Sequence, residues 1–463
     1  MNNRDFGNIG EDIACEYLKK NGYKILERNV HFSKLCEIDI IAQFKKKIIF
    51  VEVKTRRTNS FGSPLEAITK RKYENIKTGV LSYLKEHKIK DYQMSALLMA
   101  ITINGMTYEE TLDLTDIFIK SGEVYTFDKP VCDKHSTGGI GDTVTLIIAP
   151  IVAALNVPMA KMSGRGLGIT GGTIDKLESI PGFNVNLTKE EFYKGVKEIG
   201  LAISSQTENL VPLDKVIYSL RDVTGTTESI PLIASSIMSK KIASGATYIV
   251  IDIKCGEGAL IKNEKDAEEL SLYLTKIGEH FDRKVKTLIT DMDEPLSSAV
   301  GNALEVLEAK EVLETNKPCK LRDVSLEVSA NIISMAKNIK VSEAKILCAK
   351  VLENKTAYKM FEKWISYQHG DLSKVKVSDK IIKLKSNKDG VITKISALKV
   401  GKLAGYLGAS RKTKEDNIDY SVGVKLLCEA GDSVIKGQDL ALLYVNDLNV
   451  KLNEEDLKIF EIK

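Results

Sequence analysis

Apolar positions follow a helical pattern and then a strand pattern near the start of the chain. They recur at helical spacing in residues 7–21, and Gly22 can end the helix that this spacing predicts. Two β-branched runs, 37–44 and 48–56, flank a lysine-rich turn and predict a hairpin-like pair of strands. Residues 63–88 then predict a second amphipathic helix.

The pattern changes at residue 91. Residues 91–123 predict two short apolar helices joined at Gly105, and residues 310–385 predict helices that cap an α/β core. Between them, a strand, a glycine-rich loop and a helix follow one another around 135–142, and the same order returns at 159–183. Two such loops after consecutive strands predict a site at the C-terminal ends of a parallel sheet.

Length and composition narrow the class of protein. A chain of 463 residues predicts about three domains at the usual ~150 residues each. Its 43% hydrophobic and 28% charged residues are typical of a soluble, core-forming protein. It has no membrane-length apolar run and no signal-peptide pattern, and its seven cysteines lie far apart. We therefore expect a reduced, cytoplasmic protein with unpaired thiols, and not a secreted, membrane-spanning or zinc-ribbon protein.

Charge is unevenly distributed. Residues 1–90 hold 19 Lys and Arg against 11 Asp and Glu, whereas the remainder holds 48 against 52. A basic first segment indicates a partner of its own, for which nucleic acid is one candidate. The alternative is that the basic surface only keeps a small domain soluble.

The first ninety residues also contain a candidate metal site. Alternation along a strand places Glu52 and Lys54 on one face, and Asp39 lies on the neighbouring predicted strand. Two neighbouring carboxylates such as Asp39 and Glu52 can hold Mg²⁺, and a lysine beside them, here Lys54, can orient or activate water for attack on a phosphodiester. Glu11 is the fourth candidate residue of this site. The alternative is that these charges are solvated residues at a strand edge.

The motifs GxxGE, EIDxIA, FVEVKTR and FGxPxEA make a segment of roughly residues 5–88 similar to the YraN-type family of small bacterial proteins. The resemblance implies a restriction-endonuclease-like fold of the PD-(D/E)xK kind and a metal site at the four residues named above. It implies no substrate, and it leaves open whether the domain cuts nucleic acid or only binds it.

The two glycine-rich loops predict an anion site. Backbone N–H groups, hydroxyl donors and the positive end of a helix dipole together form a cradle for an anion, and Lys134, Ser163, Arg165 and Thr173 add donors or charge. The spacing matches neither a Walker loop nor GxGxxG. The alternative for either loop is a tight turn without a ligand.

A third motif follows at residues 218–241. Ser236 and Lys240 are four residues apart, so they share a helix face, and with Arg221 they can converge on a planar ligand that forms hydrogen bonds. The alternative is a surface helix with salt bridges.

The motifs KHSTGGIGD, SGRGLGITGGTIDKLESIPGF, YSLRDVTGTTESIPLIASSIMSKK and DMDEPLSSAVGNALEV resemble the pyrimidine-nucleoside phosphorylase family, which includes thymidine phosphorylase. The similarity runs from about Asp91 to the end. It implies a homodimeric pentosyltransferase of nucleoside salvage. Its expected reaction converts a pyrimidine nucleoside and phosphate, reversibly, into free base and (deoxy)ribose 1-phosphate. Uridine or thymidine preference stays open.

The resemblance also implies roles for individual residues. Phosphate would be held by Lys134, Ser136, Thr145, Lys161, Met162, Ser163 and Thr173. The pyrimidine would be held by His135, Arg221, Ser236 and Lys240, and the catalytic residues would be His135, Lys134, Arg221 and Lys240. A monovalent cation such as K⁺ would be held by Gly141, Val144, Leu296, Ala299 and Glu308. The family more often has threonine at the position of Val144.

The expected fold is α/β in four parts. The predicted boundaries are 1–90 for the endonuclease-like α/β/α domain, 91–120 with 212–246 for a helical base-binding domain, 121–211 with 247–385 for the α/β phosphate-binding domain, and 386–463 for a small C-terminal α/β domain.

The helical domain is shortened, because the family normally begins with about two more helices that help form the dimer contact and the hinge. Either a helix around Gly79–His87 replaces them, or dimerisation and closure are impaired. The rival function is a nucleic-acid-binding protein or nuclease whose phosphorylase part is an inactive scaffold.

Overall fold

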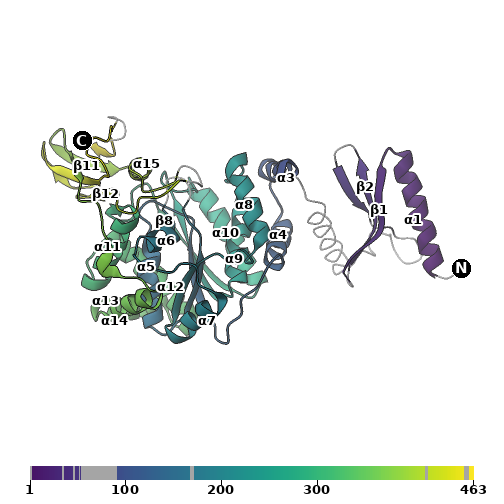
Figure 1. Ribbon diagram of the computed structural model, residues 1–463, viewed down its shortest axis with the longest axis horizontal. Helices are drawn as coiled ribbons and strands as arrows, with labels where there is room; N and C mark the ends of the chain where they lie inside the picture. Colours follow the sequence, from purple (N-terminus) through teal and green to yellow (C-terminus); the bar gives the residue numbers. More distant parts are fainter. Residues whose placement is uncertain are drawn as a thin grey trace. The chain divides into compact units, whose positions relative to one another are not determined.

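The computed structural model describes residues 3–33, 36–44, 47–51, 53, 91–166, 171–411, 416–452 and 458–463. Contacts between residues divide the chain into two units, Met1–Leu97 and Leu98–Lys463. Each unit is described by itself (Figure 1).

The first unit places one helix beside a three-stranded antiparallel sheet. Helix α1 (Asn3–Lys20) precedes strands β1 (Lys24–Ser33), β2 (Cys36–Phe44) and β3 (Lys47–Val51), in the order β1-β2-β3. The predicted first helix and the predicted strand pair are confirmed: β2 and β3 pair across the lysine-rich turn. Strand β1 was not predicted, because it is an edge strand whose charged residues weaken the period-two alternation.

A small apolar core joins helix α1 to this sheet. Cys15 and Ala42 are buried with Ile40, and Ala14 and Leu18 of α1 pack against them. The apolar side of α1 therefore packs against the sheet, as the sequence pattern predicts. The predicted helix over 63–88 lies outside the described residues.

The boundary between the two units falls within helix α3 (Asp91–Asn104). Helices α3 and α4 (Tyr108–Lys120) are joined around Gly105, whose φ of 75° is left-handed, and this confirms the two predicted helices. Thr107 caps α4 in a capping box with Glu110. Further along the chain, helices α8 (Pro212–Thr224), α9 (Ile230–Ala243) and α10 (Glu264–His280) pack with α4.

A five-stranded parallel sheet forms the centre of the second unit (Figure 1). Its order is β6-β5-β4-β7-β8. The strands are β4 (Cys132–Ser136), β5 (Met159–Ser163), β6 (Leu201–Ser205), β7 (Tyr248–Cys255) and β8 (Lys284–Asp291). Strands β4 and β5 are neighbours, so the two glycine-rich loops that follow them leave the same edge of the sheet.

Helices cover this sheet. The connecting helices are α5 (Val144–Ala154), α6 (Thr173–Glu178) and α7 (Lys189–Glu198). Helix α5 is apolar on every side and almost entirely buried, because α11 (Asn302–Thr315), α12 (Lys320–Lys337), α13 (Val341–Glu353) and α14 (Thr356–Tyr367) pack around it. Helices are thus confirmed over most of the predicted range 310–385, and Trp364 lies fully buried among them. The prediction was wrong at the end of the range, where residues Ile381–Lys385 form a strand.

The C-terminal part consists of two small antiparallel sheets and a helix. One sheet has the order β10-β14-β12-β9 and the other β13-β11-β15. Their strands are β9 (Ala299–Val300), β10 (Ile381–Lys385), β11 (Gly390–Ile395), β12 (Gly423–Leu426), β13 (Ser433–Val434), β14 (Asp439–Tyr444) and β15 (Phe460–Ile462), and the helix is α15 (Ala397–Tyr406). The first sheet takes β9 from a segment far earlier in the chain.

Two simple properties hold across the described residues. No helix there is both long enough and apolar enough to cross a membrane. The cysteines whose side chains are described are free thiols: Cys15, Cys132, Cys255, Cys319, Cys348 and Cys428.

Candidate active site

The ends of strands β4 and β5 bring most of the predicted phosphate residues to one edge of the sheet. Lys134 and Ser136 lie in the last three residues of β4, and Lys161, Met162 and Ser163 end β5. Thr145 lies in the first turn of α5, and Thr173 begins α6. Between β4 and α5, Gly138 and Gly141 have φ of 95° and 68°, which residues with a Cβ rarely adopt.

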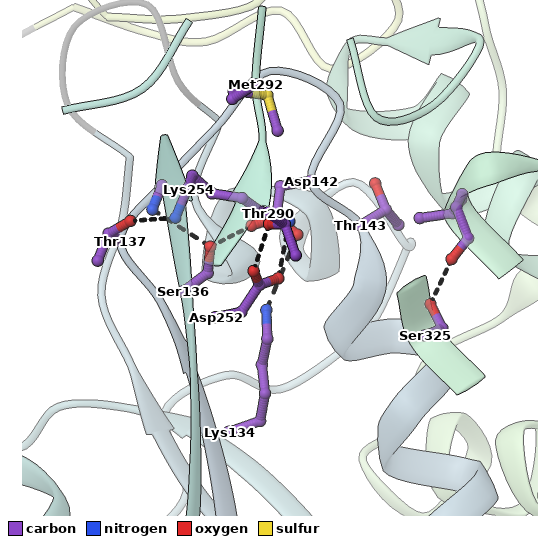
Figure 2. Close-up of polar contacts among 12 residues, drawn as sticks. Lys134, Ser136, Thr137, Asp142, Thr143, Asp252, Lys254, Thr290, Met292 and Ser325 are labelled. Carbon is purple, nitrogen blue, oxygen red and sulfur yellow. Dashed lines mark hydrogen bonds and ion pairs between the residues drawn. The ribbon is translucent and has the colours of Figure 1, made fainter. Parts of the chain in front are cut away.

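Lys134 is buried beside a carboxylate that the sequence did not single out. Its side chain is 1% exposed and its Nζ lies 3.8 Å from Oδ1 of Asp142 (Figure 2). The hydroxyl of Ser136 donates to the other oxygen of Asp142. Two predicted phosphate donors therefore meet at one carboxylate.

Burial and charge oppose each other in this pair. Burial lowers the pKa of Lys134, while the carboxylates of Asp142 and Asp252 act to raise it. Burial alone would raise the pKa of Asp142, but the charges of Lys134, Lys254 and Lys176 hold it below its ordinary value. Asp142 is therefore a carboxylate at neutral pH.

A second buried pair lies next to Lys134. Asp252 and Lys254, both 0% exposed, form an ion pair of 2.7 Å on strand β7. Thr290 donates to Asp252 at 2.6 Å and accepts from Lys254 at 3.0 Å, and Thr137 accepts from the backbone N–H of Lys254 at 2.8 Å (Figure 2). These contacts fix the segment that follows β4 against β7.

A third group supports the ends of β4 and β5 from α9. Lys241 donates to Asp133 at 2.6 Å and to the Met162 carbonyl at 3.2 Å. Lys161 lies 3.6 Å from Asp133 and donates to the Lys134 carbonyl at 2.5 Å. Burial, together with the charge of Lys241, lowers the pKa of Lys161 to about 7.

His135 follows Lys134 on β4. Its pKa lies well below the ordinary value because it is buried and because Lys241, Lys161, Lys134 and Lys240 are positive. The imidazole is therefore neutral at pH 7.

The residues predicted to hold the base lie on α8 and α9. Lys240 donates to the Ser236 hydroxyl at 2.7 Å and to the Ser236 carbonyl at 3.1 Å, which confirms that these two residues share a helix face. Lys240 also forms an ion pair with Asp214 of α8, and its Nζ lies 5.5 Å from the centre of the Tyr218 ring. Neither Asp214 nor Tyr218 was singled out from the sequence, although both precede Arg221 at helical spacing.

Arg221 is 2% exposed and supports the turn between α8 and α9. Its nitrogens donate to the carbonyls of Thr226, Thr227 and Leu232 at 3.1, 2.7 and 3.2 Å. Five guanidinium N–H groups leave donors beyond these three bonds. A contact between Arg221 and a base stays a prediction.

The residues predicted to hold a cation lie around the first glycine-rich loop. The carboxylate of Glu308 accepts from Ser298 N at 3.0 Å, from Ser298 Oγ at 2.9 Å and from Ala299 N at 2.7 Å. Leu296 N donates to the Ile140 carbonyl at 3.0 Å. A Cβ on Gly141 would lie 3.3 Å from the Ala299 carbonyl oxygen. Gly141, Leu296, Ala299 and Glu308 thus come together, whereas the buried side chain of Val144 offers no oxygen ligand.

In the first unit, two of the four candidate nuclease residues can be placed. Asp39 accepts from the backbone N–H of Val53 at 2.6 Å, so it reaches the end of β3. Glu11 lies 3.8 Å from Arg28, which binds Asp12 at 2.7 Å. Glu52 and Lys54 lie outside the described residues. Among the described residues, no group of three His, Cys, Asp or Glu could hold a metal ion.

Three family models match the chain. The a/b domain of a glycosyl transferase family matches residues 128–356, and the pyrimidine nucleoside phosphorylase C-terminal domain matches 391–458. The uncharacterised protein family UPF0102 matches residues 10–103, which confirms the resemblance of the N-terminal segment to a small-protein family.

Curated relatives and one solved structure give the same picture. Pyrimidine-nucleoside phosphorylase from Bacillus subtilis (strain 168) is 48% identical over 372 residues, which cover 78% of this chain and 86% of the relative. The enzyme of that name from Geobacillus stearothermophilus is 46% identical over 381 residues, with 79% and 88% covered. Anthranilate phosphoribosyltransferase from Thermus thermophilus has a TM-score of 0.52 at 15% identity, and the match covers 64% of this chain and 95% of that one.

The structural likeness supports the α/β fold, whereas the curated relatives cover more than three quarters of the chain and the family models match both 128–356 and 391–458. On this evidence, the chain belongs to the pyrimidine-nucleoside phosphorylase family.

Proposed function

We propose that the chain catalyses the reversible phosphorolysis of thymidine- or uridine-type nucleosides to a free pyrimidine and (deoxy)ribose 1-phosphate. One observation carries this proposal. Lys134 and Ser136 converge on a buried carboxylate at the edge of the sheet, and α9, which carries Ser236 and Lys240, is anchored to that edge through Lys241. A site for a phosphate and a site for a hydrogen-bonding ring thus share one framework.

The chemistry follows from where charge develops. As the bond between C1′ and the base nitrogen breaks, its electron pair goes to the base and the sugar carbon becomes electron-poor. Lys240 and Arg221 would stabilise the base anion, while Lys134, Ser136 and the loop amides hold phosphate, whose oxygen forms the new bond to C1′. His135 is neutral, so it would donate a hydrogen bond to the base O2 rather than act as an imidazolium acid.

We also infer a monovalent-cation site at the residues predicted for it. The Glu308 carboxylate and the carbonyls of Gly141, Leu296 and Ala299 are oxygen donors of the kind that a hard cation prefers. Bound K⁺ would supply positive charge that ties the first glycine-rich loop to the turn before β9. Val144 would contribute through its backbone alone.

Phosphate-dependent release of base is the direct test. Purified protein is mixed with thymidine or uridine, with and without phosphate, and the free base is measured. We expect release only with phosphate, and loss of release in Lys134→Ala. Absence of release from protein that is folded by circular dichroism would contradict the proposal.

A second function is favoured by the charge of the first unit. Residues 1–90 hold 19 basic against 11 acidic residues, which fits a nucleic-acid partner. If the domain also cuts, the carboxylates of Glu11, Asp39 and Glu52 would hold Mg²⁺ and Lys54 would orient or activate the attacking water. Salt-dependent DNA binding that disappears when 1–90 are removed would support it, and DNA binding unchanged by the removal would exclude it. From the family membership we also propose that the chain forms a homodimer and that it acts in the cytoplasm.

A further inference from the structure

Lys176 is a buried lysine that none of the predicted roles uses. It lies on α6, its side chain is 2% exposed, and its Nζ has three oxygen neighbours. They are the Asp142 carbonyl at 2.8 Å, the Gly171 carbonyl at 3.3 Å and Oε2 of Glu305 at 2.9 Å. An ammonium group has three N–H donors, so these contacts satisfy all of them.

The three oxygens belong to three separate parts of the site. Asp142 ends the first glycine-rich loop, Gly171 lies in the second, and Glu305 lies on α11. Glu305 also accepts from the Thr143 hydroxyl and from the Gly301 backbone N–H. We call Lys176 and Glu305 the loop clip, because together they fasten both loops to α11.

The loop clip acts on the residue at which the phosphate donors meet. The carbonyl of Asp142 accepts from Lys176, and its carboxylate accepts from Ser136 and faces Lys134. The charge of Lys176 also helps to hold the pKa of Asp142 below its ordinary value. A shift of the Asp142 backbone would therefore move both donors relative to the second loop.

We propose that Lys176 is a positioning residue for phosphate: it sets the separation of the two glycine-rich loops and never touches the phosphate itself. The inference rests on the proposed phosphorolysis. It predicts that the clip affects the affinity for phosphate and leaves the nucleoside site on α8 and α9 nearly unchanged.

Three variants separate positioning from simple support of the fold. Lys176→Met removes the ammonium and leaves Glu305 as a buried charge without its partner, which destabilises the fold. The double variant Lys176→Met/Glu305→Gln removes that charge and should recover much of the stability. Gln368→Met is a matched control for the loss of buried hydrogen bonds, because it removes those to Trp364, Ile203 and Asn184 and leaves Lys176, Glu305 and Asp142 with the partners described above.

The measurements use the full chain. KM for phosphate and KM for the nucleoside are determined for each variant, the free energy of unfolding is measured in urea, and inorganic phosphate is titrated by calorimetry. We expect the double variant to regain stability while its KM and Kd for phosphate stay raised about tenfold or more, because the two loops that hold phosphate are no longer kept at their separation. The nucleoside KM should change less than about threefold, within the scatter of one weak contact.

Two results would overturn the proposal. One is that, in the double variant, both the stability and the affinity for phosphate return to their wild-type values. The other is an equal rise of the phosphate KM and the nucleoside KM in the double variant. Such a rise would match the unspecific loss of structure for which Gln368→Met is the control. If the wild-type chain binds phosphate but releases no base, the proposed function fails, and the calorimetric affinities alone still decide the role of Lys176.

Discussion

The candidate site has one set of residues predicted to hold phosphate and another predicted to hold the base, and these phosphate and base sides are built differently. On the phosphate side, three buried lysines, Lys134, Lys176 and Lys254, face the carboxylates of Asp142, Glu305 and Asp252. Lys176 and Glu305 come from different helices, whereas Lys254 and Asp252 share strand β7. On the base side, Lys240 binds a residue one helical turn away and a carboxylate of the adjacent helix.

The two sides therefore differ in how their charges are balanced. The phosphate side balances its charges internally, so each lysine depends on a buried carboxylate, and mutation of either partner leaves a buried charge unpaired. The base side keeps Lys240 17% exposed, where water can replace a lost contact. We therefore expect phosphate-side mutations to affect stability and activity together, and base-side mutations to affect mainly activity.

The largest expected effect is the loss of a buried carboxylate. Asp252→Asn leaves Lys254 uncompensated at 0% exposure and should lower the free energy of unfolding by about 3–5 kcal/mol, as measured by urea denaturation. Asp214→Asn, its counterpart on the base side, should cost only about 1–2 kcal/mol because its partner reaches water. Equal losses in the two variants would remove the distinction between the two sides.

The next effect tests the base side through activity. Lys240→Met should lower kcat/KM for the nucleoside by about 10- to 100-fold, because a hydrogen bond from a charged donor to the base is lost. Steady-state kinetics should show KM for phosphate nearly unchanged. A parallel rise in KM for phosphate would mean that the two sides are not separable. Lys345→Ala, which breaks an exposed pair with Glu327, serves as the control for an unrelated lysine.

The smallest effect concerns pH. Because the pKa of Lys161 is lowered to about 7, its charge is lost as pH rises through that value. The kcat/KM for phosphate should then fall by about tenfold between pH 6 and pH 8, following the protonated fraction of such a group. Phosphate titrates in the same range, so the readout is the difference between the wild-type profile and that of Lys161→Met.

The same shift fixes the sign of a change in stability. Above pH 7 the folded chain has released the Lys161 proton while the unfolded chain keeps it up to its ordinary pKa. Stability rises with pH where the unfolded state binds more protons, so Lys161 should make the wild type gain stability from pH 7 upward relative to Lys161→Met. A loss of stability above pH 7 in the wild type, relative to Lys161→Met, would contradict the buried position of this lysine.

The local parts of the site could be predicted from the sequence. Strand, glycine-rich loop and helix follow one another within a few residues, and parallel strands place such loops at one edge, so Lys134, Ser136 and Ser163 were found together. The shared face of Ser236 and Lys240 follows from helix geometry alone.

The carboxylates were missed because no local pattern marks them. Thr143 and its acceptor Glu305 are separated by 162 positions, and Lys241 and Asp133 by 108. Such pairs are set by the order of strands in the sheet and by which helices pack across it. Arg221 shows the same limit. Its spacing from Ser236 and Lys240 suggested a ligand contact, but in the structure it binds carbonyls of the turn after α8. The path of that turn cannot be predicted from residue spacing.

The pairing of β9 with β12 also has a consequence for how the chain folds during synthesis. Val300 finds its partner Val424 only after roughly 120 further residues have been made. At about 5–20 residues per second, that strand edge stays open on the ribosome for roughly 6–25 seconds. An open edge is a template for wrong pairing, so the nascent chain is exposed to mispairing at this edge during that interval.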